Sequence, residues 1–153
     1  MLYIVKVFRI AFIGQNGVEL GDQGQSDLFN IISGLVDAHD YIEFNSGYGN
    51  IFERTAADIA KNILLGRTDK FGAINLWLPY KTSEHIQNRK YYEAFFDRIL
   101  FCSRKQKKSA HRKRDRELIK YSDLILFCIQ EAPPSKKQIR LAHRKKKCYI
   151  NIA

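Results

Sequence analysis

The sequence has few of the features that mark secreted, membrane-spanning or metal-binding proteins. It contains only three cysteines in 153 residues, an odd number without metal-type spacing, so we expect reduced thiols in a cytoplasmic protein. No run reaches the about 18 uninterrupted apolar residues of a membrane span. The apolar start, residues 1–13, carries Lys6 and Arg9 and lacks a small-residue cleavage site, which indicates a strand and not a signal peptide. No His, Cys, Asp and Glu group has metal spacing, so no metal and no cofactor is expected.

Acidic residues are scarce in the last third of the chain. The net charge is +10, and residues 101–147 hold 16 Lys and Arg against four acids, which gives 16 − 4 = +12 for this part and 10 − 12 = −2 for the remainder. The positive field therefore belongs to the C-terminal third, where an anionic ligand or a nucleic acid would feel it.

What is present is a regular alternation of apolar runs and amphipathic stretches, typical of an α/β protein. Strands are expected at residues 8–14, 41–44, 73–78, 124–129 and 148–152, with a short extra strand at 99–102. Helical stripes are expected at residues 28–36, 52–64, 91–99, 110–121 and 135–146, the first of them capped by Ser26 or Asp27. Residues 80–89 are interpreted as a polar loop. The pattern predicts one domain over residues 1–153, an α/β sandwich with a mainly parallel sheet of about five strands.

The most informative stretch is the small-residue loop between the second strand and its helix. Free N–H groups at a helix start attract anions, and glycine lets a ligand approach the backbone closely. A second glycine-containing loop follows the first strand, and both loops should lie at the carboxyl ends of their strands, where such sheets bind ligands. The residues expected to contact a ligand are Gly14, Gln15, Asn16, Ser46, Gly47, Tyr48, Gly49 and Asn50. The alternative is a tight turn that needs positive φ.

Four further residues are candidates for the same site. Glu53, in the first turn of its helix, can hold ribose hydroxyls or act as a base or nucleophile, or it can simply stabilise the helix N-terminus. Arg114 can bind phosphate bidentately or belong to a solvated charged face. Ser122 and Asp123 can face the ligand or cap the backbone before the strand at 124–129.

The basic third supports a different hypothesis, in which the protein binds a nucleic acid. Lys107, Lys108, Arg112 and Lys113 are then the residues expected to follow a phosphate backbone, with affinity that falls steeply as salt is added.

Residue blocks are spread over nearly the whole chain, at 12–16, 44–50, 78–80, 110–123 and 141–152. Together they resemble the SLOG superfamily, which includes the DprA/Smf DNA-processing proteins and the LOG phosphoribohydrolases. The likeness is greatest to the small bacterial YpsA-like branch. Segment 44–50 is similar to the family's Gly-Gly-Tyr-Gly-Gly-Phe-Asp block, and segment 110–123 is similar to its Lys-Arg-Asn to Ser-Asp block. The resemblance implies a Rossmann-like three-layer sandwich and binding of a nucleotide or nucleotide-derived ligand, by a sensor, a binding module or a weak nucleotide-processing protein.

The sequence also departs from the family pattern. Gln15 and Asn16 replace His-Arg, one extra residue precedes Glu53, and Asp115 replaces Asn. Residues 130–135 replace a Gly-rich turn and include prolines, which have no N–H to give a phosphate. The Pro-Gly-Gly-x-Gly-Thr-x-x-Glu motif of the phosphoribohydrolases is absent. A third hypothesis, hydrolysis of an N-glycosidic bond with Glu53 at its centre, therefore has the weakest motif support, and the sequence leaves catalysis and a homo-oligomer open.

Overall fold

The architecture is a single parallel sheet, seen in a computed structural model that describes residues 5–130 and 137–153. The sheet order is β4-β3-β2-β1-β5-β6, and every neighbouring pair is parallel. The strands are β1 (Val7–Gly14), β2 (Tyr41–Ser46), β3 (Phe71–Leu78), β4 (Arg98–Phe101), β5 (Leu124–Cys128) and β6 (Cys148–Asn151). The predicted α/β class and parallel sheet are confirmed, with six strands in place of about five because the short extra strand pairs with β3 as β4.

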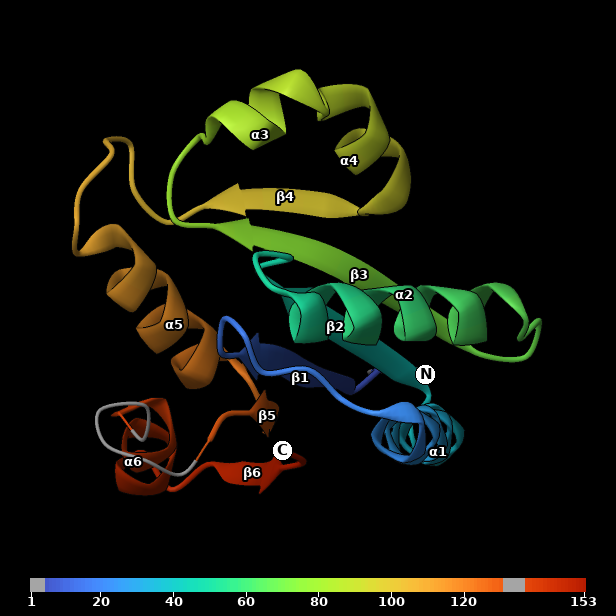
Figure 1. Cartoon of the computed structure of the whole chain (residues 1–153). Coiled ribbons are helices and arrows are strands. Elements are labelled where there is room, and N and C mark those ends of the chain that lie inside the picture. Colours follow the sequence, from blue (N-terminus) through green and yellow to red (C-terminus); the bar gives the residue numbers. More distant parts are fainter. Residues whose placement is uncertain (1–4, 131–136) are drawn as a thin grey trace.

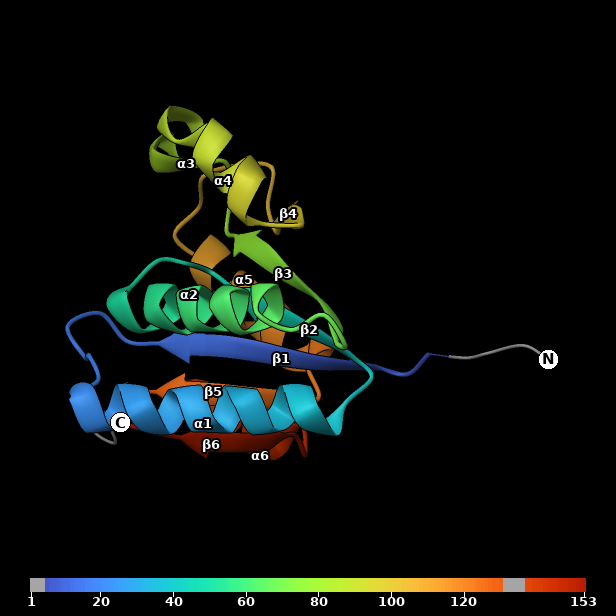
Figure 2. The ribbon, with the colours of Figure 1, turned by 90° about the vertical axis from the view of Figure 1, so that its right-hand side faces the viewer.

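Helices cover both faces of the sheet. Helices α1 (Asp22–Ala38) and α2 (Ile51–Leu65) lie on one face, and α5 (Ala110–Tyr121) and α6 (Lys137–Arg144) lie on the other (Figures 1 and 2). Two short helices, α3 (Ser83–Gln87) and α4 (Arg89–Phe95), sit beside β4 at the far edge of the sheet (Figure 1). None of the helices in residues 5–130 and 137–153 is both long and apolar enough to cross a membrane.

The core follows from side-chain alternation along the central strands. On β1, Ile10 and Phe12 pack under α1 and α2, whereas Ala11 and Ile13 face α5 and α6. All four are buried, because a parallel sheet with helices on both faces leaves neither face to water.

Parallel strands bring the two glycine-containing loops to one edge of the sheet. Strands β1 and β2 both end there, with Phe12 opposite Ser46 and Gly14 opposite Cys128. Helix α2 begins at this edge, and α5, which runs back against the strands, begins there too (Figure 1). The loops after β1 and β2 therefore meet the first turns of α2 and α5.

A buried polar network ties α5 to the sheet. The Tyr121 hydroxyl donates to Glu43 Oε1 at 2.8 Å, and the Asn75 side-chain amide donates to the same oxygen at 3.0 Å. Glu43 is only 8% exposed, so these bonds satisfy a carboxylate that would otherwise be costly to bury. They fix the C-terminal end of the helix whose second turn carries Arg114.

A candidate anion-binding site at the β1–β2 edge

The loop after β2 is held by its own hydrogen bonds. Asn50 is the N-cap of α2, and its side-chain oxygen accepts from the Glu53 amide at 3.0 Å. The buried Ser46 hydroxyl donates to the Glu53 carbonyl at 3.2 Å and accepts from the Tyr48 amide at 3.1 Å. Ser46 and Asn50 thus build the turn, and their side chains are already engaged with the protein.

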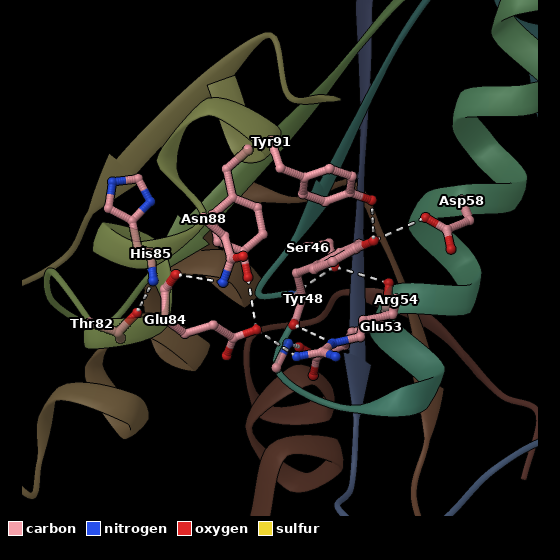
Figure 3. Close-up of polar contacts among 12 residues, drawn as sticks. Ser46, Tyr48, Glu53, Arg54, Asp58, Thr82, Glu84, His85, Asn88 and Tyr91 are labelled. Atoms are coloured by element: carbon pink, nitrogen blue, oxygen red, sulfur yellow. Dashed lines mark hydrogen bonds and ion pairs between the residues drawn. The ribbon is translucent and has the colours of Figure 1, made fainter. Parts of the chain in front are cut away.

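The positive φ of this turn falls on Tyr48, with φ 52°, and not on either glycine. The turn thus contains a positive φ, as the alternative expected, but at a residue that is not glycine. The left-handed backbone sends the Tyr48 ring toward α4, and its hydroxyl pairs with Asp58 of α2 at 3.1 Å and with Tyr91 of α4 at 3.2 Å (Figure 3). Aromatic contacts with α4 and the residue after it hold the ring in this position. The Tyr48 side chain belongs to the scaffold of the loop.

Glu53 connects the two glycine-containing loops. Its side chain is 98% enclosed, and its carboxylate accepts the Gly14 amide at 3.0 Å, the Gly49 amide at 3.2 Å and the Asn50 side-chain amide at 2.6 Å. Two of the backbone donors that the sequence assigned to a ligand are thus bound by the chain's own carboxylate. Burial raises the pKa of Glu53, and the nearby Arg114 charge and the Gly14 and Gly49 amides partly offset that rise.

Arg114 reaches the same loop from α5. A Cβ placed on Gly47 would lie 2.6 Å from Arg114 Nη1 and 2.8 Å from Glu53 Oε1, so the absence of a side chain here lets two charged groups approach the backbone. The Arg114 side chain is only 11% exposed, and its Nε and Nη2 donate to Asp115 at 3.3 and 3.1 Å. This orientation turns Nη1 toward Gly47 and the carboxylate of Glu53.

The loop after β1 closes the other side of the site. The Gln15 amide donates to the Cys128 carbonyl at 3.1 Å, and the Gln15 side-chain oxygen accepts the Gln130 amide at 3.0 Å. A Cβ on Gly14 would come within 2.5 Å of Asn50 Oδ1, so this glycine also serves a close approach between the two loops. Asn16, next in the chain, is exposed.

Two candidate residues lie outside this cluster. Asp123 accepts the Arg9 amide at 2.8 Å beside the beginning of β1, and the Ser122 hydroxyl donates to the Leu118 carbonyl at 2.7 Å at the end of α5. Both residues precede β5 and therefore lie at the amino edge of the sheet, opposite the loops. The expectation that they face the ligand is wrong, and the capping alternative describes their contacts.

The four basic candidates for nucleic-acid binding are all exposed. Lys107 and Lys108 are exposed in the segment before α5, and Arg112 and Lys113 are exposed on its first turn. Most of the replacement for the family's Gly-rich turn, residues 131–135, lies outside the described residues; Gln130 is the member of that segment whose contact is seen.

Sequence reasoning missed several basic residues that the structure gathers. Arg116 on α5 and Lys137, Arg140 and Arg144 on α6 line one hollow together with Arg112. The sequence does contain a signal for this arrangement. Residues 112 and 116, and residues 140 and 144, are four apart, and residues four apart lie on the same face of a helix. Within the described residues no cluster of three or more His, Cys, Asp and Glu has the arrangement of a metal site.

Comparison with known proteins gives structural relatives only. No family model matches the sequence, and no curated protein matches it. The structure resembles DNA processing protein A (DprA) from Helicobacter pylori with a TM-score of 0.65 and 16% identity, over 93% of this chain and 63% of that one. It resembles DprA from Streptococcus pneumoniae with a TM-score of 0.64 and 12% identity, over 94% of this chain and 49% of that one.

A second group of relatives consists of molybdenum cofactor proteins. The binding protein from Rippkaea orientalis matches with a TM-score of 0.60 and 13% identity, over 95% of this chain and 76% of that one. The carrier protein from Chlamydomonas reinhardtii matches with a TM-score of 0.59 and 12% identity, over 94% of this chain and 75% of that one. The chain spans 63% and 49% of the lengths of the two DprA chains. At sequence identities of 16% and 12%, this likeness establishes the fold alone. The chain therefore has the Rossmann-like α/β fold that is seen in DprA and in the molybdenum cofactor proteins.

Proposed function

We propose that this domain binds a nucleotide or nucleotide-derived ligand, with a phosphate seated beside Arg114 at the carboxyl edge of β1 and β2. The observation that carries the proposal is the nearly buried Arg114 guanidinium, which lies directly over Gly47. Asp115 holds two of its nitrogens and leaves Nη1 directed at the loop, which is the pre-organised arrangement that favours phosphate binding by arginine.

The role proposed for Glu53 in this site is to position both loops. Its carboxylate is bonded to Gly14, Gly49 and Asn50, so it is committed to the protein before any ligand arrives. This supports a sensor or binding module of the YpsA-like kind over an N-glycosidic hydrolase. The hydrolase hypothesis requires release of a free base that Glu53→Gln abolishes, and release unaffected by that change would remove Glu53 from the chemistry.

Calorimetric titration with a panel of nucleotides and ADP-ribose derivatives tests the proposal. Arg114→Gln should weaken binding between about tenfold and about a hundredfold, the value of a charge-assisted hydrogen bond. Arg98→Gln is the matched control, since Arg98 is exposed on β4 and has no ion pair among the described residues. Absence of binding to the whole panel, or equal affinities for the two variants, would contradict the proposal.

A second candidate function is binding of single-stranded nucleic acid by the basic third. The H. pylori relative is described as having a single-stranded DNA binding mode, and its fold covers 93% of this chain. The specific observation in its favour is the exposed series of cations around the start of α5, which includes Lys107, Lys108, Arg112 and Lys113. Affinity for an oligonucleotide that does not change with salt concentration would rule this function out.

A further inference from the structure

A hollow of about 650 Å³ lies between α5 and α6, on the face of the sheet opposite α1 and α2. Its charged lining comes from both helices and consists of Arg112, Arg116, Lys137, Arg140, Arg144 and Asp115. Five of these six side chains are cationic. The one acid, Asp115, already accepts from Arg114 at 3.1 Å and from the Gln138 side chain at 3.4 Å, so it does little to neutralise them.

Among residues 5–130 and 137–153, none of the five cations of this groove takes part in an ion pair. Several arginines outside the groove do have acidic partners: Arg54 pairs with Glu84 at 2.9 Å, and Arg89 pairs with Glu93 at 2.7 Å. A concentration of like charge opposes folding through self-repulsion, and a bound anion would relieve it.

The spacing of these cations suits a repeating anion better than a single phosphate. Arg112 and Arg116 are one turn apart on α5, and Arg140 and Arg144 are one turn apart on α6, which sets each pair about 6 Å apart along its axis. A second hollow between the same helices shares Arg116 and Leu141, and its lining adds three lysines and one acid, Glu117. Cations therefore outnumber acids in both hollows.

We propose that this groove binds the phosphodiester backbone of a single-stranded nucleic acid, an inference that rests on the second candidate function and assigns it a surface. Four of the five cations are arginines, whose planar fork fits phosphate oxygens. A volume of about 650 Å³ is that of a site enclosing a small organic ligand, so it admits a short length of one strand, whereas a duplex meets only the rim. Leu141 provides an apolar surface for a sugar or base.

The groove is distinct from the site at Arg114. The Asp115 carboxylate lies between them, bonded to Arg114 on one side and to Gln138 of α6 on the other. Strand binding and nucleotide binding should therefore respond to different substitutions.

The test compares charge-neutralised variants of the full chain in titrations with short oligothymidylate across a series of salt concentrations. Arg116→Gln/Arg140→Gln should weaken binding at least about tenfold and reduce the salt slope of log Kd by about 1.4, since each lost phosphate contact contributes about 0.7 for single strands. Lys90→Gln/Arg98→Gln is the control with the same charge change at the α4–β4 edge of the sheet.

Three results would overturn the assignment. If Lys107→Gln/Lys108→Gln abolishes oligothymidylate binding and Arg116→Gln/Arg140→Gln retains it, the nucleic acid binds outside the groove. Binding of single-stranded nucleic acid then stands as a function, without the groove as its site. If the wild-type protein binds no oligothymidylate, the function and the groove assignment both fail. If inorganic polyphosphate of equal phosphate number, or blunt duplex, binds as tightly as the single strand, the site does not recognise single-stranded nucleic acid. Titration of Arg116→Gln/Arg140→Gln with a nucleotide tests the proposed nucleotide site separately, because Arg114 is unchanged in this variant.

Discussion

Substitution of Gly47 by alanine tests the proposed site without removing any of its functional groups. The added Cβ would lie 2.6 Å from Arg114 Nη1, and an ordinary contact begins at 3.4 Å, so the guanidinium must move by about 3.4 − 2.6 = 0.8 Å. Glu53 Oε1 would have to move by about 3.4 − 2.8 = 0.6 Å, but three hydrogen bonds hold that carboxylate. The arginine is the freer of the two, so its guanidinium is expected to swing away from the loop.

The expected result is a selective loss of ligand affinity. Displacing a pre-organised guanidinium costs about 1.4 kcal/mol or more, so nucleotide affinity should fall at least about tenfold. The strain in a packed site should also lower the free energy of unfolding by about 1–3 kcal/mol. Calorimetry measures the first quantity and urea denaturation the second.

Gly49→Ala is the matched control in the same turn. The nearest atom to its Cβ, Glu53 Oε1, lies at 3.8 Å, and Gly49 does not have positive φ, so alanine fits without displacing anything. This variant should keep its affinity and be as stable as the wild-type protein or slightly more so, because alanine restricts the unfolded chain. Equal affinities of the Gly47 and Gly49 variants would refute the reasoning that the Arg114 position governs binding.

Three further predictions follow from the same contacts. Glu53→Gln should destabilise the fold by about 1–3 kcal/mol in denaturant titration, because the new amide group faces backbone donors, and a smaller loss than that of Arg98→Gln would contradict the positioning role. Burial raises the folded pKa of Glu53 above 4.5, so ionisation of this carboxyl opposes folding. The free energy of unfolding of the wild-type protein, relative to that of Glu53→Gln, should therefore fall as pH rises from the ordinary glutamate pKa through the folded pKa. A rise over that pH range would contradict a raised pKa of Glu53. Added salt should raise the Tm of the wild-type protein more than that of Arg116→Gln/Arg140→Gln, because it screens unpaired cations, and equal responses in calorimetric scans would argue against repulsion in the groove.

The fold was accessible from the sequence because each strand is a short apolar run and each long helix repeats its apolar residues every three or four positions. These local patterns are enough to predict the central strands of the sheet, including β1 and β5. The boundaries were less accessible. Helix α1 begins at Asp22 with Gly21 as its N-cap, so Ser26 and Asp27 lie inside it, and the polar segment 80–89 contains α3, which Thr82 caps by accepting the His85 amide.

The sequence predicts which loops form the candidate site, but it does not predict which side chains contact one another there. The approach of Arg114 to Gly47 joins residues 67 positions apart in the chain (114 − 47), and no local pattern reports it. The positive φ of Tyr48 is set by packing against α4, which overrides the preference for glycine. The position of Asp123 was deducible, since a residue that precedes a strand of a parallel sheet lies at the edge opposite a residue that follows one.

Whether Arg114 binds the nucleotide can be measured directly by an NMR titration that follows the Arg114 side chain. In protein labelled with ¹⁵N-arginine, the Arg114 Nε–H signal can be assigned by its disappearance in Arg114→Lys and then followed as a nucleotide is added. If Arg114 holds the phosphate, this signal should show a saturable shift with the same Kd as calorimetry, and Arg98 should respond less. A nucleotide that binds by calorimetry and leaves the Arg114 signal unmoved would show that Arg114 does not contact it.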